Sequence, residues 1–428
     1  MANSKFLPPK GFRDHLPEEM AIRRRATAIL ADVFERYGFQ PLETPTLEYA
    51  STLMGKYGAE ADKLLYLFRD RGGRDVGLNY DLTVPTARVL AAYPQLVKPF
   101  KRYQIQPAYR AENPQKGRYR QFTQCDIDTI GSDSPLADAE ILAVINDSLE
   151  ALGLANFTIY LNSRPVLYNL CKSLAVKEND WNTLLQTVDK ADKLSVAGLN
   201  VELSKKGFGD EFYSQQIKPF LDEAEANFLD SSLTGDSSLD EVYKAALEMG
   251  VPGPNLKFKP TIVRGLDYYT GSIFETVVRE PKLGSVTGGG RYDNLIAQLG
   301  GPKLTAVGST IGLDRICDVI SELKLWPKVS SRPQVLVTIF APQFKGESLK
   351  LSQALRDALI ATEVYLDPKD RLDKQLKYAD KRGIPYCLIV GDEEVKNKVA
   401  VLKDMSTGDQ ESLPLVRIRE RLSHHEAR

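Results

Sequence analysis

The 428-residue chain lacks an excess of either charge, long apolar runs and paired cysteines, and each absence excludes a class of protein. Its 56 Lys and Arg residues are matched by 57 Asp and Glu residues, so no overall basic field indicates a nucleic-acid partner. Any nucleic acid must therefore be bound by local patches. No run of about 18 apolar residues occurs, and the N-terminal stretch MANSKFLPPKGFRDHLPEEM lacks the apolar segment of a signal peptide. We expect no membrane partner.

The four cysteines are spread along the chain and never form a C-x-x-C pair: Cys125, Cys171, Cys317 and Cys387. This spacing argues against a zinc site and against a disulfide framework, and it favours a reducing compartment. We therefore expect a cytoplasmic protein with no protein-bound metal, in which the cysteines are buried as small apolar residues.

What is present is ordinary globular material, with 43% hydrophobic and 26% charged residues, and its length suits two or three domains. Apolar residues at helical spacing predict an amphipathic helix from Pro17 to Tyr37, ended by Gly38. Its predicted apolar face comprises Ile22, Ala26, Ile29, Val33 and Tyr37.

Two changes of pattern divide the chain. Residues 163–256 are rich in helical sequence such as LDEVYKAALEMG, and they interrupt a mixed strand-and-helix pattern that occupies residues 1–162 and resumes at 257–325. The stretch LWPKVSSRP has linker composition, and after it strand-like and helical runs alternate in the order βαβαβ. We predict a helical insertion within one α/β unit and a separate α/β domain at 333–428.

Polar residues are concentrated in two predicted strands, KRYQIQPAYRAE and RYRQFTQCDIDTIG, which the loop NPQKG joins into a hairpin. Because strand side chains alternate between faces, the polar residues share one face. They are Arg102, Gln104, Gln106, Arg110 and Glu112 in the first strand and Gln124, Asp126 and Asp128 in the second. Such a face is either a solvated surface or the floor of a polar site, and the hairpin alone leaves both open.

Three further stretches carry residues that a plain core does not need. RGLDYYTG precedes the predicted strand SIFETVV, although its tyrosines also suit a core. GGGRYD permits close approach of its backbone, yet it fits neither a dinucleotide fingerprint nor a P-loop. AVGSTIGLDR is a predicted strand that turns into a helix, and Arg315 in the first turn suits a phosphate or is a surface arginine.

Together these stretches resemble the histidyl-tRNA synthetases, a family of class II aminoacyl-tRNA synthetases. GFQPLETPTLE with Pro45 is similar to motif 1, the stretch from Arg110 to Gln121 to motif 2, and AVGSTIGLDR to motif 3. RGLDYYTG and GGGRYD resemble the two histidine-specific signatures almost letter for letter. The resemblance implies an α+β catalytic core with an antiparallel sheet flanked by helices in 1–162 and 257–325. It also implies a helical insertion domain in 163–256 and an α/β anticodon-binding domain in 333–428.

The implied reaction is the ATP-dependent ligation of L-histidine to its tRNA through a histidyl-adenylate, in a homodimer joined through motif 1. ATP is then a substrate with Mg²⁺ bound through its phosphates, and no prosthetic group is needed. The resemblance assigns ATP contacts to Arg110, Glu112, Arg118 and Arg315. Of these, Arg110 faces the α-phosphate, Glu112 reads the adenine, and the other two hold the outer phosphates. Arg264 resembles the family's catalytic arginine and acts with Arg110.

By the same resemblance, eight residues bind histidine: Asp81, Thr83, Arg110, Gln124, Asp128, Arg264, Tyr268 and Tyr269. The ammonium group of histidine needs acceptors, which match Asp81, Thr83 and Gln124. The donor and acceptor edges of the imidazole match Asp128 and the two tyrosines. A site of such polar pairs rejects apolar analogues by on the order of 10⁴ or more, because its own groups would be left unpaired.

Contacts to tRNA are expected at Gln115 in the loop NPQKG, and at Lys374 and Lys381 on one face of the predicted helix DRLDKQLKYADKRG. A solvated helix face is the alternative for that basic stripe. LNYDLTVP and Asn113 depart from the commonest bacterial pattern, which leaves open how the 5′ guanosine and the discriminator base of the tRNA are read.

A second function stays open, because the non-catalytic regulatory subunit of ATP phosphoribosyltransferase in histidine biosynthesis shares this fold. Such subunits typically lack the anticodon-binding domain and have altered catalytic arginines. Here Arg110, Arg264 and Arg315 are all present and the C-terminal domain follows, so the ligase is favoured.

Overall fold

The computed structural model describes residues 6–54, 63–115, 117–228, 236–263, 269–281, 283–327 and 332–423. The chain forms two compact units, residues 1–329 and residues 330–428. Each unit has its own central sheet and its own hydrophobic core.

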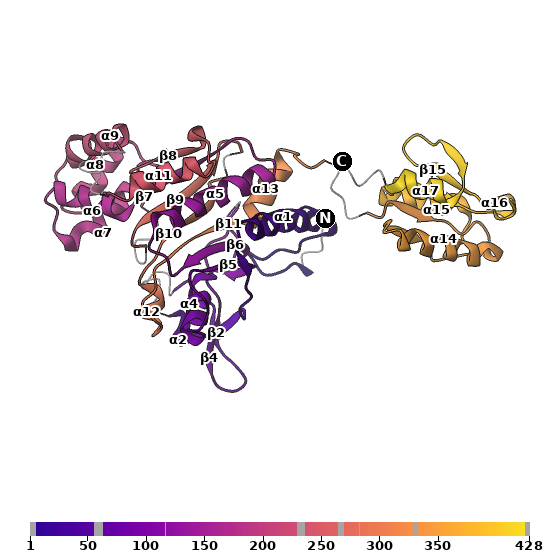
Figure 1. The fold of residues 1–428 in the computed structure, drawn as a ribbon, viewed down its shortest axis with the longest axis horizontal. Coiled ribbons are helices and arrows are strands. Elements are labelled where there is room, and N and C mark those ends of the chain that lie inside the picture. Colours follow the sequence, from indigo (N-terminus) through magenta and orange to yellow (C-terminus); the bar gives the residue numbers. More distant parts are fainter. Residues whose placement is uncertain are drawn as a thin grey trace. The chain divides into compact units, whose positions relative to one another are not determined.

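The first unit is built around an eight-stranded sheet with the order β1-β5-β6-β11-β10-β9-β7-β8 (Figure 1). All pairings from β5 to β7 are antiparallel, while β1 and β8 add parallel strands at the two edges. The strands are β1 (Gln40–Pro41), β5 (Phe100–Tyr109), β6 (Gln121–Ile130), β7 (Phe157–Ser163), β8 (Leu256–Phe258), β9 (Ser272–Val278), β10 (Ser285–Arg291) and β11 (Ala306–Gly312). The predicted antiparallel sheet is confirmed.

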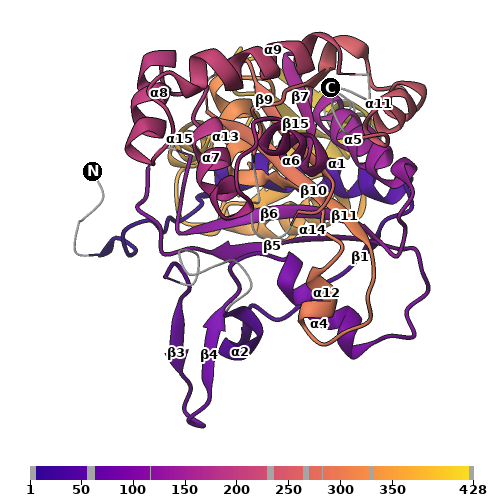
Figure 2. The same ribbon diagram turned by 90° about the vertical axis from the view of Figure 1, so that its left-hand side faces the viewer.

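Helices cover both faces of this sheet (Figures 1 and 2). One face carries α1 (Pro17–Arg36), α5 (Pro135–Ala151) and α13 (Leu313–Glu322), and the other carries α4 (Thr83–Ala92) and α12 (Leu295–Gln298). A small three-stranded sheet lies beside α2 (Ala50–Leu53), formed by β2 (Leu47–Tyr49), β4 (Asp75–Leu78) and β3 (Leu67–Arg69).

Helix α1 ends where the sequence indicates, because Gly38 just beyond it has a φ of +78°, a left-handed conformation that glycine adopts readily. Its buried face is shifted from the prediction and comprises Arg23, Ala26, Leu30, Val33 and Phe34. Three residues of the predicted face, Ile22, Ile29 and Tyr37, are half-buried. The shift follows from packing, since α1 contacts both α5 and α13.

The side chains of strand β6 point alternately into the core and toward the opposite face of the sheet. Cys125 and Ile127 belong to the core that the sheet shares with α1, α5 and α13. Because side chains alternate along a strand, Gln124, Asp126 and Asp128 point away from that core. The four cysteines are buried and free, as predicted.

Helices fill most of the segment between β7 and β8. They are α6 (Arg164–Ser173), α7 (Trp181–Val188), α8 (Val196–Lys205), α9 (Lys218–Ala226) and α11 (Leu239–Glu248). The first four pack largely around a cluster of their own, which includes Leu170, Leu184 and Leu203. Helix α11 differs, because it packs against α5 and shares the core of the main sheet.

The second unit contains a five-stranded sheet in the order β13-β12-β14-β15-β16. The predicted βαβαβ alternation is confirmed by parallel β12 (Val335–Val337), β13 (Thr362–Val364) and β14 (Tyr386–Ile389), with α14 (Lys345–Asp357) and α15 (Leu372–Arg382) between them. Four later elements were not predicted, namely α16 (Asp392–Asn397), β15 (Ala400–Asp404), β16 (Gln410–Leu413) and α17 (Leu415–Ser423).

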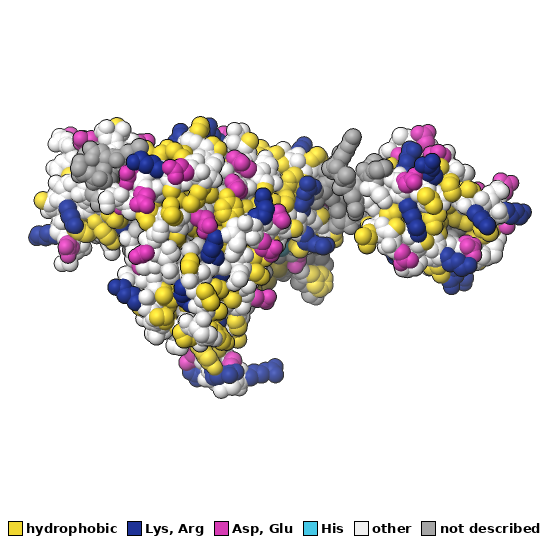
Figure 3. Space-filling view, viewed as in Figure 1, with side chains coloured by type: hydrophobic (Ala, Val, Ile, Leu, Met, Phe, Trp, Pro, Cys, Tyr) yellow, Lys and Arg dark blue, Asp and Glu magenta, His cyan; other side chains and the backbone are white. Residues whose placement is uncertain are grey.

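Charges of both signs are interspersed on the visible surface of each unit, as the balanced composition suggests (Figure 3). Within the described ranges, no helix combines the length and apolar character needed to cross a bilayer.

Candidate active site

The polar face of the β5–β6 hairpin is buried rather than solvated. Arg102 and Gln104 are 0% exposed, and Asp126 and Asp128 are each 3% exposed. The alternative of a solvated outer face is therefore wrong. Because burying charged groups is costly without partners, their concentration here needs a specific explanation.

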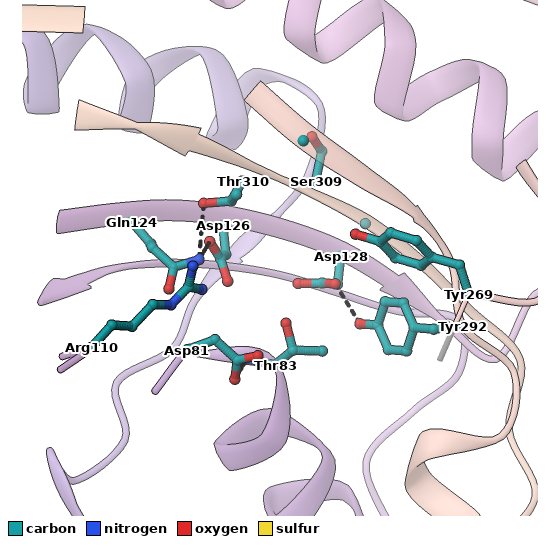
Figure 4. Close-up of a pocket in the computed structure, with 12 residues that line it drawn as sticks. Asp81, Thr83, Arg110, Gln124, Asp126, Asp128, Tyr269, Tyr292, Ser309 and Thr310 are labelled. Atoms are coloured by element: carbon teal, nitrogen blue, oxygen red, sulfur yellow. Dashed lines mark hydrogen bonds between the residues drawn. The ribbon is translucent and has the colours of Figure 1, made fainter. Parts of the chain in front are cut away.

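Asp126 and Asp128 line a cavity of about 240 Å³, the first pocket (Figure 4). It is lined by Asp81, Thr83, Arg110, Gln124, Asp126, Asp128, Tyr269, Gly288, Tyr292, Gly308, Ser309 and Thr310. Six of these residues were predicted from the sequence to bind histidine: Asp81, Thr83, Arg110, Gln124, Asp128 and Tyr269. The fold thus brings these six together from four separate stretches of the chain.

Three carboxylates face the first pocket, and each is held in place. Asp81 lies at the start of α4, where its Oδ1 accepts hydrogen bonds from the backbone amides of Thr83 at 3.0 Å and Val84 at 3.1 Å. Asp126 accepts a 3.3 Å hydrogen bond from Gln124 Nε2, and Asp128 accepts one from the Tyr292 hydroxyl. The carboxylates are therefore oriented before any ligand is present.

Burial changes the acidity of two of these groups. It raises the pKa of Asp126 to about 7, against the opposing effect of Arg102. Burial also raises the pKa of Asp128, while Arg102 and the hydrogen bond from Tyr292 limit the rise. A cationic ligand would compensate such carboxylates, so the first pocket suits a ligand that carries positive charge and hydrogen-bond donors.

Two buried acceptors at the first pocket have no hydrogen-bond partner among the described residues. They are Gln124 Oε1 and Ser309 Oγ. Buried polar atoms are nearly always paired, so these two indicate a bound polar ligand or water at this position.

A second pocket of about 200 Å³ adjoins the first. Its lining comprises Arg110, Glu112, Gly117, Arg118, Tyr119, Phe122, Thr123, Gln124, Ser285, Val286, Thr287, Gly288, Thr310, Gly312, Asp314 and Arg315. Four residues line both pockets, namely Arg110, Gln124, Gly288 and Thr310. A ligand in one pocket can therefore meet a ligand in the other at these residues.

Arg110 stands at this junction in a fixed position. Its Nε donates to the Tyr80 carbonyl at 3.2 Å, and its guanidinium lies 4.3 Å from the centroid of the Tyr80 ring and 5.0 Å from that of Phe122. Aromatic faces attract a guanidinium and hold its plane. The arrangement presents a fixed cation to both pockets.

The other predicted ATP contacts lie on the wall of the second pocket. Glu112 and Arg118 form an ion pair with each other at 2.9 Å. Arg315 donates to the carbonyl of Gly117 at 3.0 Å and to that of Ser285. Three predicted arginines, Arg110, Arg118 and Arg315, thus surround one cavity, which suits a polyanion.

The glycines of β10 and β11 make room for different neighbours. A Cβ on Gly289 would lie 2.2 Å from the Gly308 carbonyl oxygen, and one on Gly290 would lie 2.4 Å from the Ser272 carbonyl oxygen. These two glycines of GGGRYD therefore permit close strand packing, whereas Gly288 lines the pockets. Gly308 makes room for a site residue, since a Cβ there would lie 1.9 Å from Asp128 Oδ1.

Some predicted residues lie elsewhere. Arg264 and Tyr268 fall outside the described residues. Gln115 is exposed in the loop between β5 and β6, and Lys374 and Lys381 are exposed on α15 of the second unit.

Sequence reasoning missed several residues around the first pocket: Arg102 as a counterion, and Asp126, Tyr292, Ser309 and Thr310 as lining residues. Arg102 and Asp126 were on the predicted polar face, so the signal was present. What was missing was the register of the two strands, which sets Arg102 directly opposite Asp128.

Asp314, a carboxylate of the second pocket, already has several partners. Asp314 is paired with Arg13 and Arg23, each at 2.8 Å, and it accepts from the backbone amide of Thr123. Burial alone would raise the pKa of Asp314, but Arg23 and these other partners lower it. No group of three or more His, Cys, Asp or Glu side chains in the described part of the chain could hold a metal ion.

Known proteins are similar to this chain in sequence and in fold. A family model described as Histidyl-tRNA synthetase matches residues 11–316, and one described as Anticodon binding domain matches residues 334–425. The histidine–tRNA ligase of Rhodopirellula baltica is 40% identical over 418 residues, which cover 94% of each chain. The crystal structure of histidyl-tRNA synthetase from Nostoc sp. PCC 7120 aligns with a TM-score of 0.86 at 30% identity, covering 99% of this chain and 100% of that chain.

A further structure has the same fold. It is described as an ATP phosphoribosyltransferase regulatory subunit/histidyl-tRNA synthetase from Bacillus halodurans C, and it aligns with a TM-score of 0.73 at 21% identity. The alignment covers 88% of this chain and 97% of that chain.

Proposed function

The chain belongs to the histidyl-tRNA synthetase family, and from this premise we propose that its two adjoining pockets hold histidine and ATP side by side. As a member of that family it is an enzyme that ligates histidine to tRNA, with ATP as a substrate. The observation that supports the placement of the two substrates is Arg110, a fixed cation that lines both pockets.

In the activation step, a carboxylate oxygen of histidine attacks the α-phosphorus of ATP. A bond forms between them, and the bond to the β-phosphate breaks and releases pyrophosphate. Negative charge accumulates at the junction of the pockets, and a preorganised cation there lowers the barrier. Arg110 is the proposed cation, because it lines both pockets. Arg264 is the proposed second cation, and its role rests on the resemblance of RGLDYYTG to the family signature.

The second pocket is the proposed ATP site. Its three arginines would neutralise the phosphates, with Arg118 and Arg315 toward the outer ones. The pairing of Glu112 with Arg118 supports this arrangement. ATP would offer each partner a replacement, an adenine amino group for the carboxylate and a phosphate for the guanidinium.

The first pocket is the proposed histidine site. Asp81, Thr83 and Gln124 would accept hydrogen bonds from the ammonium group. Asp128 and Tyr269 would contact the two edges of the imidazole together with Tyr268, whose role rests on resemblance alone. The raised pKa values of Asp126 and Asp128 fit a pocket whose carboxylates await a cationic, donor-rich ligand.

Magnesium is proposed to enter bound to the phosphates of ATP, where it would neutralise their charge. Both carboxylates of the second pocket are already paired with arginines, Asp314 with two and Glu112 with one. This pairing supports binding of Mg²⁺ together with ATP.

The remaining assignments are also proposals. The second unit would bind the anticodon region of the tRNA, with Lys374 and Lys381 as contacts, while Gln115 would face the acceptor end. The insertion domain at 163–256, a homodimer joined through motif 1 around Pro45 and a cytoplasmic location follow from the resemblance.

The proposal is tested by pyrophosphate exchange into ATP with each of the twenty amino acids in turn. Exchange with histidine alone is the expected result, because the first pocket rejects ligands that leave its polar groups unpaired. Exchange with another amino acid would overturn the assignment of the first pocket. The absence of exchange from folded protein would favour the alternative, a regulatory subunit, which is the less supported function.

A further inference from the structure

Arg102 lies beside Asp128, a residue of the proposed histidine pocket, and has no role in the reaction described above. It is 0% exposed, and the ladder of β5 and β6 sets it opposite Asp128. Its Nη2 is 2.6 Å from Asp128 Oδ2 and 3.8 Å from Asp126 Oδ2. One buried cation therefore serves two carboxylates that face the same cavity.

The two carboxylates need such a cation because their negative charges repel each other. Asp126 and Asp128 are two residues apart on one strand face, so the charge on Asp128 disfavours ionisation of Asp126. A third carboxylate, Asp81, faces the same pocket and also raises the pKa of both. Without a counterion, the protein would protonate these groups rather than keep them charged in the cavity.

Arg102 is itself held by a buried network. Its Nη1 donates to Gln104 Oε1 at 3.2 Å, and Gln104 Nε2 donates to Thr44 Oγ1 at 2.7 Å. Its Nε and Nη2 have no hydrogen-bond partner among the residues that the structure describes, so the 2.6 Å contact of Nη2 with Asp128 Oδ2 is an ion pair without hydrogen-bond geometry. The ion pair with Asp128 is thus the main compensation for burying the guanidinium, which ties the two side chains to one geometry.

We propose that Arg102 is a positioning residue for histidine recognition, which holds Asp128 ionised and directed at the imidazole while Asp126 stands beside it in the same pocket. The inference rests on the proposed function, because it takes the first pocket as the histidine site. Arg102 does not line either pocket, so it acts through Asp128.

The test measures the KM for histidine and the KM for ATP separately, by pyrophosphate exchange. In Arg102→Gln, the KM for histidine is expected to rise about 30-fold or more and the KM for ATP to stay within about 3-fold, as for a truncated partner of a buried charge pair. Arg102→Lys keeps the charge, so its KM for histidine should lie between those of the unaltered enzyme and Arg102→Gln. The double variant Arg102→Gln with Asp126→Asn removes one carboxylate with the cation, and it should recover about tenfold of the lost affinity.

A matched control is Lys101→Gln. Lys101 is the neighbour of Arg102 on β5, its Nζ lies 2.7 Å from Glu140 Oε1, and it lines neither pocket. Its loss should lower the melting temperature without changing the ratio of the two KM values. If Arg102→Gln behaves in the same way, the role of Arg102 is structural and the inference is wrong. If Arg102→Gln does not fold, Arg102→Lys decides, and equal changes in both KM values would overturn the inference.

A pH profile gives an independent result. Arg102 lowers the pKa of Asp128, so its removal should raise that pKa and restrict histidine binding to higher pH. The other charged or titratable groups that face Asp128 are Asp81, Asp126, Arg110, Tyr269 and Tyr292. The KM for histidine should therefore fall more steeply with rising pH in Arg102→Gln than in the unaltered enzyme, and parallel profiles would contradict the inference. Unaltered enzyme without histidine-dependent exchange would instead refute the proposed function itself.

Discussion

Aspartates in the first pocket and on the surface of the second unit look alike in the sequence, but their pKa values are shifted in opposite directions. Burial raises the pKa of Asp126 to about 7, whereas hydrogen bonds from Lys374 and then Tyr365 lower the pKa of Asp370 at the start of α15. A surface carboxylate keeps its charge with help from water and one lysine. A buried carboxylate needs a counterion built into the fold, so its presence indicates a function.

The proposed role of Arg110 predicts the largest effect. If Arg110 stabilises the transition state as proposed, Arg110→Ala should lower kcat/KM for pyrophosphate exchange by about 10² to 10⁴, because a preorganised charge partner would be lost. The surface control is Arg36→Ala, since Arg36 pairs with Asp32 on the exposed side of α1. That variant should stay within about twofold, as exposed pairs contribute little. Equal effects in the two variants would remove the distinction between pocket and surface charges.

Replacing a glycine by alanine should also have different effects in the first pocket and in the second unit. In Gly308→Ala the new Cβ would overlap Asp128 Oδ1, so kcat/KM for histidine should fall by on the order of 10², with a smaller change in the KM for ATP. At Gly346 in α14 of the second unit, a Cβ would meet no atom within 4 Å. Gly346→Ala should leave exchange unchanged and stabilise the protein by up to about 0.5 kcal/mol, measured by chemical denaturation. Normal histidine kinetics in Gly308→Ala would show that the position of Asp128 does not matter.

Charge reversal on α15 tests whether the surface charges have a function of their own. Lys374→Glu with Lys381→Glu should lower kcat/KM for tRNA by about tenfold and make it less dependent on salt, because the proposed phosphate contacts would be lost. Exchange without tRNA should be unaffected. The control is Lys350→Glu on α14, where an exposed lysine pairs with Glu347. Unchanged aminoacylation would mean that the basic face of α15 is simply solvated.

The smallest expected effect concerns stability. The folded pKa of Asp126, about 7, is above its unfolded value, so the folded state binds more protons between about pH 4 and 7. This group therefore loses stabilisation as the pH rises through that range. As the pH rises from 5 to 8, the free energy of unfolding of Asp126→Asn should therefore increase relative to that of the unaltered protein, by on the order of 1 kcal/mol.

The surface counterpart is Asp370→Asn. The pKa of Asp370 is lowered, so its contribution is complete above its unfolded pKa and is lost only as the pH falls below it. Its replacement should not change the pH dependence between pH 5 and 8. Urea unfolding at several pH values compares the two variants, and identical slopes would show that burial does not perturb Asp126.

Much of the fold and of the site could be predicted from the sequence. The period-2 alternation of β5 and β6 identified the polar face, and Gly38 marked the end of α1, because these signals depend on neighbouring residues. The hairpin of β15 and β16 was missed, since its short strands carry little apolar alternation and its outer strand is mostly exposed.

The sequence by itself determined the family, through motifs whose residue types and spacing are local properties of the chain, and it placed Arg102, Asp126 and Asp128 on one strand face. Only the tertiary structure decided that this face is buried and that Arg102 stands opposite Asp128. It also decided that Gly308 leaves room for that carboxylate and that Arg110 joins two cavities. The physical reason is that strand register and burial depend on contacts between residues far apart in the sequence.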